Sequence, residues 1–73
     1  MPRAGLAVLP SLRYWRIRLD LTRQQLAGRS TMSRSTVLRI ETGYPAFLRT
    51  ARLLAAALEV QVDDLTGQPP EAL

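Results

Sequence analysis

The sequence predicts an all-α domain, a compact bundle of short helices. Apolar residues recur at helical spacing in several short segments, and residues that cap helices precede them. Polar turns or Gly and Pro residues separate these segments. The chain has 73 residues and no cysteine or histidine, so disulfides and the usual metal sites are excluded. One small hydrophobic core must therefore hold a single domain together.

The first 11 residues are predicted to form an N-terminal arm, because two prolines and a glycine surround a short apolar stretch. The large apolar residues of this arm either pack on the body of the domain or meet a partner chain; they are Leu6, Val8 and Leu9. Ser11 is the expected N-cap of a first helix, whose apolar positions are Leu12, Trp15 and Leu19. Asp20 is expected to end this helix, since aspartate tolerates the left-handed conformation better than most residues.

A second helix is expected to begin after Thr22, which forms a capping-box pattern with Gln25. Its apolar face contains Leu26 and Ala27, and Gly28 within it suggests that the helix ends early.

A polar turn over residues 30–32 leads to a third helix. Ser33 is its expected N-cap, Val37 and Ile40 its buried face, and Gly43 its C-terminal stop.

Residues 44–48 are predicted to be a loop, because Pro45 restricts the residue before it and cannot extend a helix. A strongly helix-favouring stretch covers residues 49–58, and Asp63-Asp64-Leu65 fits a short final helix. The predicted organisation is thus an arm over residues 1–11, a folded domain over 12–67 and a flexible tail over 68–73.

Charge is distributed unevenly along the chain. All ten basic residues are arginines, and the formal net charge is +4. Residues 1–52 hold ten Arg against Asp20 and Glu41, which gives +8, whereas residues 53–73 hold four acids and no base, which gives −4. This asymmetry fits a nucleic-acid-facing side, although it is also compatible with an ordinary solvated surface.

Catalysis is not expected, because the chain lacks the usual histidine, cysteine and lysine, and no carboxylate pair or phosphate-binding loop appears. No metal or cofactor is expected either. No apolar run approaches the roughly 20 residues of a membrane span, and residues 4–9 are too short for a secretory signal, so a cytoplasmic location without membrane contact is expected.

Residues 12–65 resemble the lambda-repressor-like, XRE-type (Cro-like) helix-turn-helix family. The resemblance rests on blocks in register: Leu12, Trp15 and Arg16; Leu21-Thr22-Arg23 with Leu26-Ala27; Ser33, Val37, Ile40, Glu41 and Gly43; then Leu48, Thr50, Ala57-Leu58, Val60 and Leu65. It implies about five helices, with the third helix, residues 33–42, reading the major groove of double-stranded DNA. The implied function is that of a small transcriptional regulator, a repressor, acting as a homodimer on an operator.

The resemblance also implies roles for individual residues. The implied base contacts are Arg34, Ser35, Thr36 and Arg39. The implied phosphate contacts are Thr22, Arg23, Ser33, Tyr44 and Arg49. Arg16 and Glu41 are implied to form a structural ion pair between the first and third helices. Arg39 could instead be a solvated surface residue, and Tyr44 could pack within its loop.

Three positions depart from the family, which often has glycine where this chain has Asp20, Thr31 and Glu59. Because a β-branched residue disfavours positive φ, Thr31 predicts either a modified turn or local strain. The alternative to a DNA regulator is a protein-interaction module, such as an antitoxin-like partner of another protein, with DNA binding secondary. Non-specific RNA binding through the arginines is a third alternative.

Overall fold

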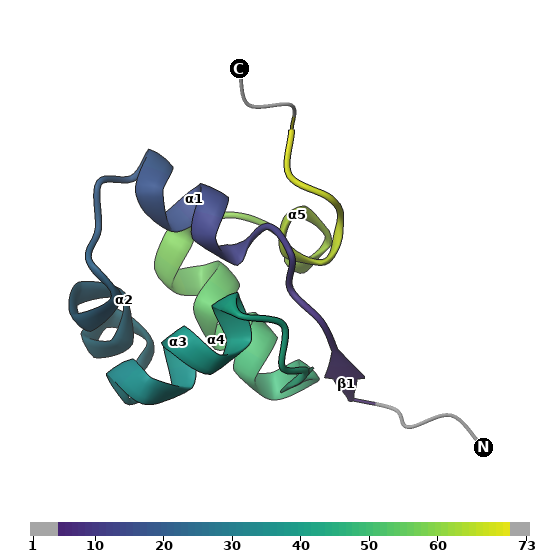
Figure 1. Ribbon diagram of the computed structural model, residues 1–73, viewed down its shortest axis with the longest axis horizontal. Coiled ribbons are helices and arrows are strands. Elements are labelled where there is room, and N and C mark those ends of the chain that lie inside the picture. Colours follow the sequence, from purple (N-terminus) through teal and green to yellow (C-terminus); the bar gives the residue numbers. More distant parts are fainter. Residues whose placement is uncertain (1–4, 71–73) are drawn as a thin grey trace.

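A computed structural model describes residues 5–70 and consists of five helices and a short two-stranded sheet. Helix α4 lies at the centre, with α1, α2, α3 and α5 around it and β1 at one edge (Figure 1). The prediction of an all-α bundle is confirmed. The elements are β1 (Leu6–Ala7), α1 (Leu12–Arg18), α2 (Arg23–Ser30), α3 (Arg34–Glu41), β2 (Ala46–Phe47), α4 (Leu48–Leu58) and α5 (Val62–Thr66). Parts of the predicted arm (residues 1–4) and tail (residues 71–73) lie outside the described residues.

The core is built almost entirely from leucine and alanine, with α4 as its largest contributor. Alanines on α4 let the neighbouring helices approach its backbone closely, while leucines fill the remaining space. The buried residues of α4 are Ala51, Leu54, Ala55 and Leu58. The other buried apolar residues are Leu9, Leu12, Leu21, Leu26, Ala27, Val37, Ile40, Ala46 and Leu65.

Helix α1 differs from the prediction at its N-cap, whereas Asp20 follows its C-terminal end with a φ of 60°, the left-handed backbone expected of it. Ser11 is its N-cap residue, but the hydroxyl makes no capping hydrogen bond and instead donates to the Gly67 carbonyl at 2.6 Å. This contact ties the start of α1 to the end of α5. Leu19 was expected in the core but is 44% exposed, because α1 already ends at Arg18. Trp15 is partly buried against the core and donates its indole N–H to the Asp64 carbonyl at 3.2 Å.

Helix α2 begins at the predicted capping box. The Thr22 hydroxyl accepts from the Gln25 amide at 3.0 Å, and the Gln25 side chain accepts from the Thr22 amide at 2.8 Å. The expectation of an early end at Gly28 is wrong, since α2 continues to Ser30. Burial of Leu26, Ala27 and Ser30 on one face holds the last turn despite the low helix propensity of glycine.

The three positions where glycine is replaced all have left-handed backbone: φ is 60° at Asp20, 58° at Thr31 and 60° at Glu59. The turn between α2 and α3 is therefore of the left-handed kind that favours glycine, and it carries a β-branched residue. Of the two expectations for Thr31, the structure supports local strain, which costs on the order of 1–2 kcal/mol.

The segment predicted as a loop contains a strand. β2 pairs antiparallel with β1, with Leu6 opposite Phe47 and Ala7 opposite Ala46. α4 begins directly after β2, one residue earlier than predicted. The arm therefore packs on the domain through Leu9 and Ala7, whereas Leu6 and Val8 remain exposed.

Candidate nucleic-acid interface

The candidate interface centres on α3, which buries one face and exposes the other. Ser33 begins the helix, and its hydroxyl accepts from the Thr36 amide at 3.1 Å. Val37 and Ile40 are 0% and 4% exposed, and they fix the inner face against the core. Because successive residues of a helix are about 100° apart, the opposite side must present its side chains to solvent.

The predicted base-contacting residues differ in their exposure. Arg34, Ser35 and Arg39 are exposed, whereas Thr36 is half-buried at the side of the helix. The Thr36 hydroxyl also lies 2.9 Å from the Ser33 hydroxyl, so the two side chains form one capping unit. Three of the four residues are therefore directly available to a ligand that approaches this face.

Leu38 lies on the same exposed face and was missed by the sequence analysis. It is 44% exposed and falls between Arg34 and Ser35 around the helix. Its apolar character directed attention away from it. Its position in the helix could have revealed it. Leu38 is rotated by about 100° from Val37, so it does not lie on the buried face that Val37 and Ile40 share.

Tyr44 lies beside Arg39 at the C-terminal end of α3. The Arg39 guanidinium carbon is 5.8 Å from the centre of the Tyr44 ring, within the range of a cation–π contact. The Arg39 carbonyl accepts from the Tyr44 amide at 3.1 Å and from the Thr42 hydroxyl at 2.8 Å. Tyr44 is 60% exposed, so its ring forms an outer surface beside Arg39 rather than part of the core.

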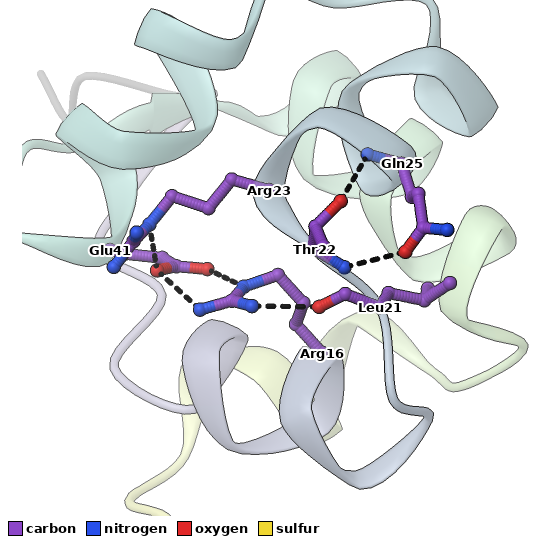
Figure 2. Close-up of polar contacts among 6 residues, drawn as sticks. All are labelled: Arg16, Leu21, Thr22, Arg23, Gln25 and Glu41. Atoms are coloured by element: carbon purple, nitrogen blue, oxygen red, sulfur yellow. Dashed lines mark hydrogen bonds and ion pairs between the residues drawn. The ribbon is translucent and has the colours of Figure 1, made fainter.

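A buried carboxylate connects the ends of three helices. Glu41, whose side chain is 2% exposed, accepts from Arg16 Nε at 2.6 Å and from Arg23 Nε at 2.9 Å. Arg16 Nη1 also donates to the Leu21 carbonyl at 2.7 Å, just before α2 (Figure 2). The Arg16–Glu41 pair thus has a second cation, which sequence reasoning had assigned only to phosphate. This cluster holds α1, α2 and the end of α3 in a fixed relation.

Arg23 nevertheless keeps part of its surface free. Its side chain is 35% exposed, and only Nε faces Glu41, so the outer N–H groups remain available to an anion. Arg23 borders an open hollow of about 480 Å³ between the starts of α2 and α3, together with Arg16, Thr22, Gln24 and Arg34. Glu41 offsets one of the three arginine charges, and the remaining positive charge together with two helix N-termini favours an anion in this hollow.

Seven of the nine predicted contact residues fall into three groups, and the other two, Ser33 and Ser35, are exposed at the start of α3. Thr22, Arg23 and Arg34 share the hollow just described. Thr36, Arg39 and Tyr44 line a smaller hollow of about 170 Å³ between α3 and the start of α4. Arg49 lines neither; it is exposed in the first turn of α4, next to Phe47 and Gly5.

Other kinds of site were sought in the part of the chain that the structure describes. Residues 5–70 contain no group of three metal-ligating side chains. No helix within them has the length and apolar character needed to cross a membrane.

Comparison with known proteins gives one match. A family model described as helix-turn-helix matches residues 12–65, which is well over half of the chain. The matched segment begins with α1 and reaches into α5. Neither a curated protein nor a solved structure matches the sequence.

Proposed function

Since the chain belongs to the XRE/lambda-repressor-like helix-turn-helix family, we propose that it is a sequence-specific repressor that binds double-stranded DNA as a homodimer. DNA-binding transcription regulation is the general function of this family. The proposal adds the reading residues, the symmetry of the complex and the direction of regulation.

The exposed face of α3 carries this proposal. The major groove admits one α-helix, and arginine donates two hydrogen bonds to the O6 and N7 atoms of guanine. Arg34 and Arg39 lie at opposite ends of the exposed face, with Ser35 and Leu38 between them. We assign the two arginines to base edges, Ser35 and Thr36 to neighbouring bases, and Leu38 to a thymine methyl group.

The surroundings of α3 support contacts to the DNA backbone. Arg23 and the capping residues Thr22 and Ser33 lie at helix N-termini, where amides and the helix dipole favour phosphate. Tyr44 and Arg49 extend this surface past the C-terminal end of α3. Their contacts position the domain on the duplex and carry no sequence information directly.

The small size of the reading surface supports the dimer in this proposal. One eight-residue helix covers few base pairs, so a tight specific site needs two half-sites about one helical turn apart. We assign the direction of regulation to repression, in which occupancy of the operator blocks transcription.

A salt-dependent titration tests the proposal. Binding of the full chain is measured to a duplex selected for affinity and to a scrambled duplex of equal length. We expect a preference for the selected duplex that persists at physiological salt, since base contacts depend less on counterion release than phosphate contacts do. Equal affinity for both duplexes at that salt concentration would refute sequence-specific regulation.

The alternative is a protein-interaction module whose DNA binding is secondary. The exposed apolar residues of the sheet, Leu6 and Phe47 among them, favour this reading over non-specific RNA binding. A preference for the selected duplex distinguishes the two functions, because a protein-binding surface at the sheet does not produce it.

A further inference from the structure

The small sheet has one buried face and one exposed apolar face. Ala46 and Leu9 are 5% and 1% exposed and pack on the core, as alternation along the strands requires. The opposite face carries Leu6, Val8 and Phe47, which are 43%, 47% and 63% exposed. Antiparallel sheets normally present polar residues on a solvated face. We call these three residues the apolar sheet face.

Among residues 5–70, strand β1 pairs only with β2, so its other edge is open. The Leu48 amide donates to the Gly5 carbonyl, so Gly5 and Leu48 form a hydrogen-bonded pair. Because hydrogen-bonded and non-hydrogen-bonded pairs alternate, Leu6 is in a non-hydrogen-bonded pair with Phe47. The N–H and C=O groups of Leu6 therefore point away from β2. Val8 is two residues further along, so the same alternation directs its N–H and C=O groups to the same side. Residues 5–9 contain no charged residue or proline, the usual devices that protect such an edge.

We propose that a second copy of this chain pairs its own β1 with this open edge, so that Leu6 and Val8 of the two copies pack side by side on the apolar sheet face. The two strands run antiparallel about a two-fold axis at Ala7, which places Leu6 opposite Val8 of the second copy. This register satisfies both outward-pointing residues of each strand. It joins the two small sheets into one sheet of four strands, with a continuous apolar surface across the two-fold axis.

Charge favours a second copy over a different protein. Residues 5–12 and 42–48, which carry the apolar sheet face, contain no charged side chain, although 22% of the whole chain is charged. The exposed Arg49 borders Phe47 and Gly5 from the first turn of α4, outside the paired strands. Two copies with a net charge of +4 each therefore meet at a neutral surface, where no like charges are brought together. An antiparallel edge is also self-complementary, so an identical strand fulfils every hydrogen bond it offers.

The interface also suits the arrangement that the proposed function requires, on which this step rests. β2 follows α3 after residues 42–45, so a joined sheet connects the C-terminal ends of the two reading helices. β1 lies at the edge of the molecule, on the opposite side from α2 (Figure 1). The hollow beside Arg23, at the start of α2, therefore remains free for phosphate.

The interface is small. One short strand with two partly exposed side chains, Leu6 and Val8, buries less in each copy than the roughly 1,200–2,000 Å² of a stable complex requires. We therefore expect a weak dimer in solution. DNA stabilises this dimer, because adjacent half-sites raise the effective concentration of the second copy.

Sedimentation of the full chain without DNA tests the interface. We expect a concentration-dependent monomer–dimer equilibrium, which Val8→Lys weakens at least about tenfold because it places a charge against an apolar surface. Ile17→Lys is the matched control: Ile17 is 49% exposed, as Val8 is 47%, but lies on α1. Circular dichroism checks that both variants are folded, and Leu6→Lys replaces Val8→Lys if the latter is not, since Leu6 is 43% exposed at the same edge. Equal effects of the two lysines, or a wild-type chain that stays monomeric up to millimolar concentration, would overturn the proposal.

Cross-linking tests the register. The chain has no cysteine, so introduced thiols have no native competitor. Leu6→Cys and Val8→Cys are oxidised separately and as a mixture. Paired residues in the proposed register lie about 5.5 Å apart at Cα, within disulfide range. The mixture should cross-link and each single variant should not. A bridge in a single variant alone, or none in the mixture, contradicts this register.

DNA binding separates this proposal from the proposed function. If the interface is right, Val8→Lys removes cooperativity on two half-sites but leaves affinity for one half-site equal to that of Ile17→Lys. A wild-type chain that dimerises without any sequence preference would refute the proposed function and retain the interface. A wild-type chain that prefers its selected DNA but binds two half-sites independently would refute the interface and retain the proposed function.

Discussion

Replacing Glu41 by glutamine should strongly destabilise the domain. The Glu41 carboxylate is 2% exposed and neutralises Arg16, whose side chain is only 9% exposed. Removing one partner of a buried ion pair leaves an uncompensated charge and costs about 3–5 kcal/mol. Because glutamine keeps one acceptor oxygen, the lower end applies, about 3 kcal/mol. A domain of this size has a total stability of only about 4–11 kcal/mol.

Thermal and urea unfolding, followed by circular dichroism, measure this effect. At roughly 4–8 °C per kcal/mol, Tm should fall by about 12–24 °C. Arg23→Gln is the matched control, because the Arg23 side chain is 35% exposed and its removal leaves the Arg16–Glu41 pair in place. This control should cost no more than about 1 kcal/mol. The double replacement Arg16→Met with Glu41→Leu should recover much of the loss. Equal losses for Glu41→Gln and Arg23→Gln would refute the central position of the carboxylate.

Three further predictions follow from single positions. Gly28→Ala should raise the free energy of unfolding by about 0.5–1 kcal/mol, because a Cβ at this helical site meets nothing within 4 Å; a loss in urea unfolding would contradict it. Thr31→Gly should raise the free energy of unfolding by about 0.5–1 kcal/mol, because relief of the left-handed strain exceeds the cost of the greater conformational entropy of glycine in the unfolded chain. A lower Tm for this variant would show that the turn is unstrained. Arg39→Ala should weaken the selected site by about 1–3 kcal/mol and relax one base-pair preference, whereas Arg49→Ala should weaken all sequences alike and lower the salt slope by about one. Both variants are titrated against duplexes that differ from the selected site at one base pair. If Arg39→Ala weakens binding to all of these duplexes equally, the base contact is rejected.

Local signals allowed much of the fold to be predicted from the sequence. The capping box of Thr22 and Gln25 and the glycine after α3 act within a few residues, so their effect does not depend on the rest of the fold. The exposed face of α3 was also accessible, since Val37 and Ile40 determine which side is buried. The partial exception is Leu38, which the assumption of polar reading residues left out.

Long-range contacts were not accessible in the same way. The pairing of β1 with β2 joins two-residue strands, too short for an alternating pattern to be recognised. Ser11 forms its hydrogen bond with Gly67, 56 residues away, in place of the local cap. Arg23 meets Glu41 only because α2 and α3 pack against each other, so its position alone suggested phosphate.

Selection of bound sites from random duplex DNA, at physiological salt, tests the account most directly. A dimer that reads DNA through Arg34 and Arg39 should enrich a sequence with two-fold symmetry, at least one G·C pair in each half-site, and half-site centres about one helical turn apart. Failure to enrich any sequence would contradict sequence-specific recognition by α3.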